Sequence, residues 1–357
     1  MEVLYRKRTL VNPTFNDVHV AFKLNGFNLD RDDLCRLAYS FIKEGEPYER
    51  AVGTFLLDWF DPNPQIEMIT SGTTGKPKVI VVDKQAMVNS AVATGDFFDL
   101  MAGNRALHCL PTKYVAGKMM FVRGFILGLD MDFVAPKANP LENNDSTYDF
   151  AAMVPLQAEN AYDRLHQVKK LIIGGVRMSP ALEQKLTLLP TKVYETYGMT
   201  ETITHIAAKE LGEDAFTVLP DVTISYNDTN CLVIHAPRIS PDIIETNDLV
   251  ELVNENQFRF LGRIDNVVNS GGIKLIPEQI EEKLAHSIDR RFFLAGVPDE
   301  QLGEKLILVI EGAPYELPEG IYDHLDKYEK PKKTYFVPTF DETGTGKLMR
   351  KQIVNSL

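Results

Sequence analysis

The sequence predicts an α/β fold with two domains: a large N-terminal domain, residues 1–264, and a small, mobile α+β domain, residues 265–357. Between residues 66 and 198, short apolar runs alternate with helical stretches, which is typical of mixed or parallel sheets covered by helices. Between residues 205 and 261, turn residues separate apolar runs without helices, which predicts a short antiparallel β subdomain. After Gly262, helices and strands mix again over roughly 90 residues, enough for a small domain.

The first 65 residues predict two helices, Asp32–Lys43 and Pro47–Phe60, because their apolar residues recur at intervals of three and four. The other elements of the N-terminal domain are expected as strands at 66–69, 79–82, 106–110, 131–134, 150–154, 170–173 and 192–194, and as helices at 84–100, 118–127, 156–167 and 180–188. Antiparallel strands are expected at 223–226, 231–234, 249–252 and 258–260. The C-terminal domain is expected to contain helices at 277–286, 320–328 and from 347, and strands at 292–297, 305–311 and 334–337.

The charge and cysteine content exclude several classes of protein. The 357-residue chain has a net charge of −12 at pH 7, which disfavours general binding to nucleic acid or to an anionic membrane. Its three cysteines, Cys35, Cys109 and Cys231, are far apart and lack metal-ligand spacing, so they are expected to be reduced core residues. No run of 18 apolar residues occurs, so we expect a cytoplasmic protein without a signal peptide or a membrane span.

The stretch ITSGTTGKPK, residues 69–78, joins two predicted strands. Its glycines let backbone N–H groups converge, its hydroxyls add donors and its lysines add charge, which is the composition of a polyphosphate-binding loop. It is not a Walker loop, because Pro77 follows Lys76 where that motif needs serine or threonine. For the loop alone, a glycine-rich hairpin with solvated lysines is an equally good interpretation.

Four further motifs follow along the chain. A predicted strand ends in Gly174 and Gly175, where a backbone edge can lie against a purine. The stretch 194–201, YETYGMTE, combines a ring for stacking, a hydroxyl for a phosphate oxygen and a carboxylate for Mg²⁺. The stretch 262–281 holds a glycine-flanked arginine, a glycine pair and a helix opened by proline, which suits a hinged, ligand-lined seam. The stretch 343–350, TGTGKLMR, puts a lysine on a glycine-rich tip. Taken alone, the glycine pair at 174–175 is more simply interpreted as an ordinary tight turn, and the lysine of 343–350 as a solvated surface residue.

In this order, the motifs closely resemble those of the acyl-adenylate-forming enzymes, which include acyl- and aryl-CoA synthetases, luciferases and the adenylation domains of peptide synthetases. The match is to the patterns TSGTTGxPK, YGxTE, GRxDxxxxxGGxxIxPxEIE and a C-terminal GK, and it extends from residue 69 to residue 350. Within this family, the stretch 110–117, followed by Met120, Arg123 and Gly124, looks most like the o-succinylbenzoate–CoA ligases of menaquinone biosynthesis.

The resemblance implies a two-step reaction: a carboxylic acid attacks the α-phosphate of Mg·ATP to give acyl-AMP and pyrophosphate, and the thiolate of CoA then displaces AMP. It also implies roles for individual residues. The phosphates of ATP would be held by Ser71, Thr73, Thr74, Lys76 and Thr200, Mg²⁺ by Glu201, adenine by Gly174, Gly175 and Tyr197, and the ribose by Asp248 and Arg263. Lys347 would stabilise the charge that develops between the carboxylate and the phosphate.

Asp265 resembles the family's hinge, about which the C-terminal domain swings between the two half-reactions. One arrangement would bring Lys347 to the adenylation site. The other would withdraw Lys347 and present Gly271 and Gly272 to the pantetheine arm of CoA.

Two features depart from the family. Only 68 residues precede Ile69, so we expect much of the usual N-terminal subdomain to be missing or replaced, which opens one wall of the acyl pocket or leaves room for a homodimer partner. Tyr114 stands where many members have a histidine at the entrance for the carboxylate. Lys118 and Arg123 are the basic residues best placed by sequence to bind a second carboxylate of the acid, and a helix-surface charge is the alternative interpretation of each.

The sequence leaves other functions open. Another aryl- or fatty acyl-CoA synthetase, or an adenylating enzyme that loads a carrier protein, would use the same motifs. A non-catalytic nucleotide-binding protein would bind ATP without turnover. A Walker-type NTPase, already disfavoured by Pro77, would release ADP rather than AMP.

Overall fold

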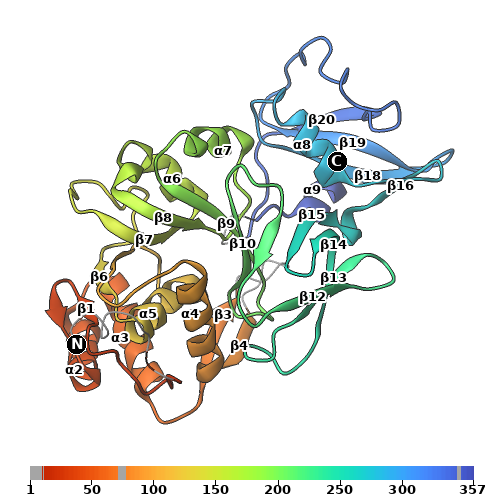
Figure 1. Cartoon of the computed structure of the whole chain (residues 1–357). Helices are drawn as coiled ribbons and strands as arrows, with labels where there is room; N and C mark the ends of the chain where they lie inside the picture. The colour runs from red at the N-terminus through yellow and green to blue at the C-terminus, as the bar shows by residue number, and fades with distance from the viewer. Residues whose placement is uncertain (1–9, 11, 71–77, 344–346) are drawn as a thin grey trace.

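The structure is a computed structural model that describes residues 10, 12–70, 78–343 and 347–357 (Figure 1). Its main sheet has 13 strands in the order β12-β13-β14-β15-β11-β10-β9-β8-β7-β5-β6-β1-β2. The strands from β9 to β1 pair in parallel, whereas β10 and the strands beyond it pair antiparallel. The predicted mixed α/β class is therefore confirmed.

Helices cover the parallel part of this sheet (Figure 1). The strands are β1 (Lys23–Leu24), β2 (Phe27–Asn28), β5 (Arg105–His108), β6 (Asp130–Phe133), β7 (Tyr148–Met153), β8 (Val168–Ile173) and β9 (Lys192–Gly198). The helices are α2 (Arg31–Glu44), α3 (Pro47–Phe60), α4 (Lys84–Phe97), α5 (Val115–Leu127), α6 (Pro155–Asn160), the 3₁₀ helix η1 (Tyr162–Gln167) and α7 (Pro180–Thr187). Helix α5 ends at Gly128, whose φ of +70° closes the helix in a conformation that glycine adopts freely. No helix in the described part of the chain is both long and apolar enough to cross a bilayer.

Two strands form a separate antiparallel sheet, β3 (Gln65–Thr70) with β4 (Lys78–Asp83). Ile66 pairs with Val82, and both side chains are buried in the main core. The strands predicted at 66–69 and 79–82 are thus confirmed.

The predicted antiparallel strands are also confirmed, and they continue the main sheet because β10 pairs with β9. They are β10 (His205–Glu210), β11 (Phe216–Val218), β12 (Thr223–Tyr226), β13 (Cys231–His235), β14 (Ile244–Asn254) and β15 (Gln257–Arg263).

The C-terminal segment folds around its own five-stranded sheet. Its elements are β16 (Val268–Ser270), β17 (Ile273–Leu275), α8 (Pro277–Leu284), β18 (Phe292–Asp299), β19 (Gly303–Glu311), β20 (Lys333–Val337) and α9 (Arg350–Asn355). The helix predicted at 320–328 is wrong. Ile321 and Leu325 are buried four residues apart, as a helix would place them, but backbone bonds three residues apart fold the segment into successive turns instead.

The C-terminal segment lies against the antiparallel end of the main sheet, and α8 contacts β15 (Figure 1). The approach is close at Gly262, where an added Cβ would come within 2.5 Å of a carboxylate oxygen of Glu278. Arg177 faces Glu282 at 3.8 Å, and the amide of Gln184 lies 3.2 Å from Nδ1 of His286. These contacts hold one particular orientation of the C-terminal segment.

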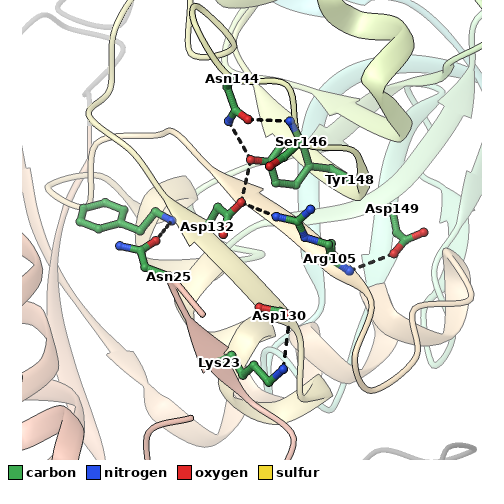
Figure 2. Close-up of polar contacts among 10 residues, drawn as sticks. Lys23, Asn25, Arg105, Asp130, Asp132, Asn144, Ser146, Tyr148 and Asp149 are labelled. Atoms are coloured by element: carbon green, nitrogen blue, oxygen red, sulfur yellow. Dashed lines mark hydrogen bonds and ion pairs between the residues drawn. The ribbon is translucent and has the colours of Figure 1, made fainter. Parts of the chain in front are cut away.

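A polar network lies at the amino ends of β5 and β7, where Arg105 and Tyr148 reach Asp132, the third residue of β6 (Figure 2). Arg105 and the hydroxyl of Tyr148 both donate to Asp132, at 2.7 and 2.8 Å. Asn144 donates to the Tyr148 oxygen at 2.7 Å, and the backbone N–H of Arg105 donates to Asp149 at 2.9 Å. Each ionised side chain of this network faces an opposite charge or a hydrogen-bond donor.

Candidate active site

The predicted adenine-binding glycines, Gly174 and Gly175, lie at the carboxyl end of the parallel strand β8, the edge at which open α/β sheets bind ligands. Gly174 directly follows β8, and its N–H donates to the carbonyl of Met153 at the end of β7. An added Cβ on Gly174 would lie 2.7 Å from Oγ1 of Thr196 on β9, so only glycine fits here without displacing that hydroxyl. Gly175 has a φ of +94°, which again favours glycine. A flat ligand can therefore approach this backbone edge closely.

The structure brings Tyr197, Asp248 and Arg263 together from three strands. Asp248 is 7% exposed and accepts from the Tyr197 hydroxyl at 2.5 Å and from the Arg263 guanidinium at 3.2 Å. Burial and the Asp248 carboxylate raise the pKa of Tyr197, so the phenol stays protonated and keeps donating. Asp248 and Arg263, the two residues predicted to bind a ribose, are thus neighbours. The hydrogen bond from Tyr197 holds the Asp248 carboxylate in position.

Lys347 of the C-terminal segment lies within electrostatic range of this pair. Its N–H donates to the Thr343 hydroxyl, and its carbonyl accepts from the Thr343 N–H, as in a hairpin. Lys347 as a whole is exposed, but the protein around its ammonium group partly desolvates that group. This desolvation and the positive charge of Arg263 lower the pKa of Lys347, whereas the negative charge of Asp248 raises it. In this orientation, the C-terminal segment therefore places the Lys347 ammonium near the predicted nucleotide site.

The turn that holds Thr200 and Glu201 follows β9 and has a strained backbone. Ile203, a β-branched residue that is 7% exposed, has a φ of +64°, which such residues rarely adopt. The Thr202 hydroxyl braces the turn, accepting from the Met199 N–H at 2.9 Å and lying 2.8 Å from the carbonyl of Thr204. Strain held by packing at this strand end is typical of a functional site.

The carboxylate of Glu201 is exposed and makes no ion pair or hydrogen bond with any described residue. Within the described ranges, no group of three or more His, Cys, Asp or Glu side chains could hold a metal ion. One free carboxylate fits Mg²⁺, which commonly binds through one or two carboxylates, water and the phosphates of a substrate. The donor set is therefore suitable for Mg²⁺ that arrives with a nucleotide.

Several predicted residues lie elsewhere. Ser71, Thr73, Thr74 and Lys76 are outside the described residues. Asp265 lies in the 3₁₀ turn η2 (Ile264–Asn266) and accepts from Arg263 and Asn247, at 3.0 and 3.2 Å. Gly271 and Gly272 form the two-residue turn between β16 and β17, and both have positive φ, as a type I′ hairpin turn requires.

The two basic residues predicted to bind the acid lie in different surroundings. Lys118 donates to the carbonyl of Glu67 on β3 at 3.1 Å and lies over the ring of Phe55, so it holds α5 against β3 and α3. Arg123 is 2% exposed, and burial lowers its pKa to about 10. Tyr114 is the N-cap residue of α5 and is half-buried. Because Lys118 and Arg123 are five residues apart on one helix, they face different directions.

Arg123 has an unusual set of partners for a buried cation. In the described part of the chain its guanidinium contacts the Met120 thioether at 3.6 Å, the Thr204 hydroxyl at 3.5 Å and Nδ1 of His205 at 3.4 Å, and it contacts no carboxylate. Its Nε has no partner among these residues. Thr204 and His205 were not predicted as site residues; the only hint in the sequence is that they directly follow the YGMTE motif.

Comparisons with known proteins identify a matching family and several similar proteins. The family model for AMP-binding enzymes matches residues 58–236. The 2-succinylbenzoate–CoA ligase of Salmonella typhimurium is 25% identical over 85% of this chain and 71% of its own length. The structure of an acyl-CoA synthetase (AMP-forming)/AMP-acid ligase II-like protein from Dyadobacter fermentans has a TM-score of 0.62 and 35% identity over 90% of this chain and 97% of that one. The Bacillus subtilis o-succinylbenzoate–CoA synthetase, solved with ATP and magnesium, shares the fold with a TM-score of 0.70 and 19% identity over 81% of this chain and 69% of that one.

Proposed function

Since this chain belongs to the family of AMP-binding enzymes, we propose that it joins o-succinylbenzoate to coenzyme A in menaquinone biosynthesis. The chain is an AMP-forming acid–thiol ligase, and the identity of its acid is the new element of the proposal. The Salmonella typhimurium relative carries the name of a ligase for this acid. The observation that carries the proposal is the buried guanidinium of Arg123.

A buried cation without an anion is costly, because desolvation is not offset by an ion pair. Arg123 is such a cation: it is 2% exposed, and its described partners are neutral groups. Guanidinium groups bind carboxylates well, often through two parallel hydrogen bonds. Adenylation consumes one carboxylate of the substrate, so an acid with a second carboxylate would supply the missing anion. o-Succinylbenzoate is an aromatic acid of this kind.

The reaction would proceed in two steps at the carboxyl ends of the parallel strands. In the first, one carboxylate of the acid attacks the α-phosphate of Mg·ATP, forming acyl-AMP and releasing pyrophosphate. In the second, the CoA thiolate attacks the acyl carbon and AMP leaves. We assign Thr200 to the α-phosphate, Glu201 to Mg²⁺ and Lys347 to the developing charge on the phosphate and carboxylate oxygens.

The remaining assignments concern ligand binding and domain movement. We assign adenine to Gly174, Gly175 and Tyr197, the ribose to Asp248 and Arg263, the terminal phosphates to Ser71, Thr73, Thr74 and Lys76, and the pantetheine arm of CoA to Gly271 and Gly272. The domains would meet at residues 264 and 265, with Asp265 as the hinge. The proximity of Lys347 to Asp248 and Arg263 supports an orientation suited to the first step.

Product analysis by mass spectrometry tests the proposal. Purified protein is incubated with Mg·ATP and CoA in three reactions, which contain o-succinylbenzoate, benzoate or a medium-chain fatty acid. We expect AMP and a thioester only with o-succinylbenzoate. AMP and a thioester only with another acid would refute the proposed substrate. AMP without a free CoA thioester would point to a carrier protein as the acceptor.

A further inference from the structure

We propose that His205 is a positioning residue, whose neutral imidazole accepts a hydrogen bond from Arg123 and fixes the guanidinium for the second carboxylate of the acid. This inference rests on the proposed function, in which Arg123 binds that carboxylate. His205 begins β10, Arg123 belongs to α5, and a third member of the cluster, Thr94, belongs to α4. The three side chains are buried, so their hydrogen bonds are shielded from water.

The hydrogen bonds of the cluster define which nitrogen of His205 carries the proton. The Thr94 hydroxyl donates to the backbone carbonyl of Ser90, one helical turn earlier, at 2.8 Å. Its oxygen is therefore an acceptor toward Nε2 of His205, 3.5 Å away. Nε2 then carries the hydrogen, which leaves a lone pair on Nδ1. The Arg123 guanidinium, a pure donor, lies 3.4 Å from that Nδ1.

The opposite protonation state fits this cluster poorly. A protonated Nδ1 would face Arg123 donor to donor and would place two positive charges side by side. Burial and the charge of Arg123 both lower the pKa of His205 well below its usual value, in agreement with a neutral ring. The chain from Ser90 through Thr94 and His205 to Arg123 thus has one consistent direction of donation.

The cluster leaves donors of Arg123 available for a ligand. A guanidinium has five N–H groups, and within the described structure Nε has no partner while Nη1 contacts only a thioether. Nη2 also lies 3.5 Å from the hydroxyl of Thr204, which is three residues beyond Glu201, and that hydroxyl lies 3.3 Å from Nδ1 of His205, so Thr204 shares this corner of the cluster. His205 therefore accepts a hydrogen bond from Nη2 of the guanidinium. The N–H groups without a partner remain available for a carboxylate of the acid, which would bind near the predicted magnesium ligand.

Three variants separate positioning from packing. His205→Leu keeps an apolar side chain of similar size but removes the acceptor. His205→Gln keeps an amide acceptor for Arg123 and an amide donor for Thr94. Thr94→Val removes the acceptor for Nε2 and changes little volume. For each variant, KM is measured for o-succinylbenzoate and for ATP, together with Tm.

We expect His205→Leu to raise KM for o-succinylbenzoate by about tenfold, the effect of losing one hydrogen bond to a charged group. KM for ATP should stay within about twofold of the wild-type value, because the hydrogen-bond partners of the His205 ring, Thr94, Arg123 and Thr204, are not residues that we assign to the nucleotide. His205→Gln should restore KM for the acid to within about threefold, and Thr94→Val should give an intermediate value. In an Arg123→Leu background, His205→Leu should add no further increase, because the two residues act through one contact.

Equal increases in His205→Leu and His205→Gln would overturn the inference, since shape rather than hydrogen bonding would then matter. So would additive effects of His205→Leu and Arg123→Leu. If His205→Leu fails to fold, Thr94→Val decides, and an unchanged KM for the acid in that variant refutes the inference. Failure of the proposed function is distinct, because the wild-type protein would then form no AMP with o-succinylbenzoate.

Discussion

The two ends of the parallel strands differ in how their charged side chains are paired. At the amino ends, Arg105 and Asp132 form an ion pair at 2.7 Å, and Tyr148 completes the hydrogen bonds of that acid (Figure 2). Near the carboxyl ends, Glu201, which follows β9, and Arg123 of α5 have no oppositely charged partner among the described residues, and Arg123 is buried. The parallel strands thus have paired charges at one end, whereas Glu201 and Arg123 near the other end are unpaired, although Asp248 and Arg263 of the antiparallel strands form an ion pair in the same site.

Under the proposed function, this difference separates residues that stabilise the fold from residues that bind a ligand. Paired polar groups recover part of their desolvation free energy within the protein. An unpaired buried cation recovers little, so its presence lowers the free energy of unfolding unless a ligand supplies the anion. Substitutions at the carboxyl ends should therefore change activity more than stability, and substitutions at the amino ends should do the reverse.

The largest effect is expected for Lys347→Ala. Loss of the cation beside Asp248 and Arg263 should slow acyl-AMP formation by about 10²–10³-fold, because preorganised charge stabilises the transition state of this step. Thioester formation from supplied acyl-AMP should stay within about twofold. ATP–pyrophosphate exchange and a stopped assay with acyl-AMP measure the two steps, and Lys351→Ala, an exposed lysine on α9, is the control. Equal loss of both steps would contradict the assignment.

Arg123→Leu should have the next largest effect. Removing the guanidinium removes the partner of the second carboxylate, so kcat/KM for o-succinylbenzoate should fall by about 10²-fold. KM for ATP should change little. Thermal stability should be kept or raised, because a costly buried charge is replaced by an apolar side chain. Lys118→Leu is the matched control on the same helix, and an equal loss in that variant would argue against a special role for Arg123.

Tyr197→Phe should have a moderate effect. The ring remains against Phe258 while the hydrogen bond to Asp248 is lost, so the acid is less firmly placed for a ribose. KM for ATP should rise by about tenfold with little change in KM for the acid. Steady-state kinetics with each substrate varied in turn measure this, and Tyr226→Phe, an exposed tyrosine on β12, is the control. A change confined to KM for the acid would place Tyr197 in a different site.

Much of this organisation follows from local patterns in the sequence. The alternation of strands and helices predicts the parallel sheet because each repeat carries its own periodicity, and helix 47–60 is predicted with the bounds it has in α3. Asp248 and Arg263 were expected to act together from the family resemblance, and they are neighbours across adjacent strands. Their proximity also has a local origin, because β14 and β15 form a hairpin.

The parts that were not predicted depend on contacts between distant residues. His205 contacts Arg123 and Thr94, which are 82 and 111 residues away, so no local pattern marks the cluster. From the sequence, Lys118 and Arg123 were equally good candidates for binding the second carboxylate. Helix periodicity shows which residues share a face, but it does not show which other elements pack against that face. The strand pair β1–β2 was missed because its two-residue strands are too short to show alternation.

Tyr148→Phe should have the smallest effect, and it tests the amino-end half of the comparison. Tyr148 is 1% exposed, and its hydroxyl accepts from Asn144 and donates to Asp132. Losing both hydrogen bonds while Arg105 still pairs with Asp132 should lower the free energy of unfolding by about 1 kcal/mol, or Tm by about 1–2 °C. Calorimetry measures the shift, and Tyr39→Phe, an exposed tyrosine on α2, is the control. KM for ATP and for the acid should not change. An altered KM without a change in Tm would mean that this network also shapes the substrate site, and the division between the two ends of the sheet would fail.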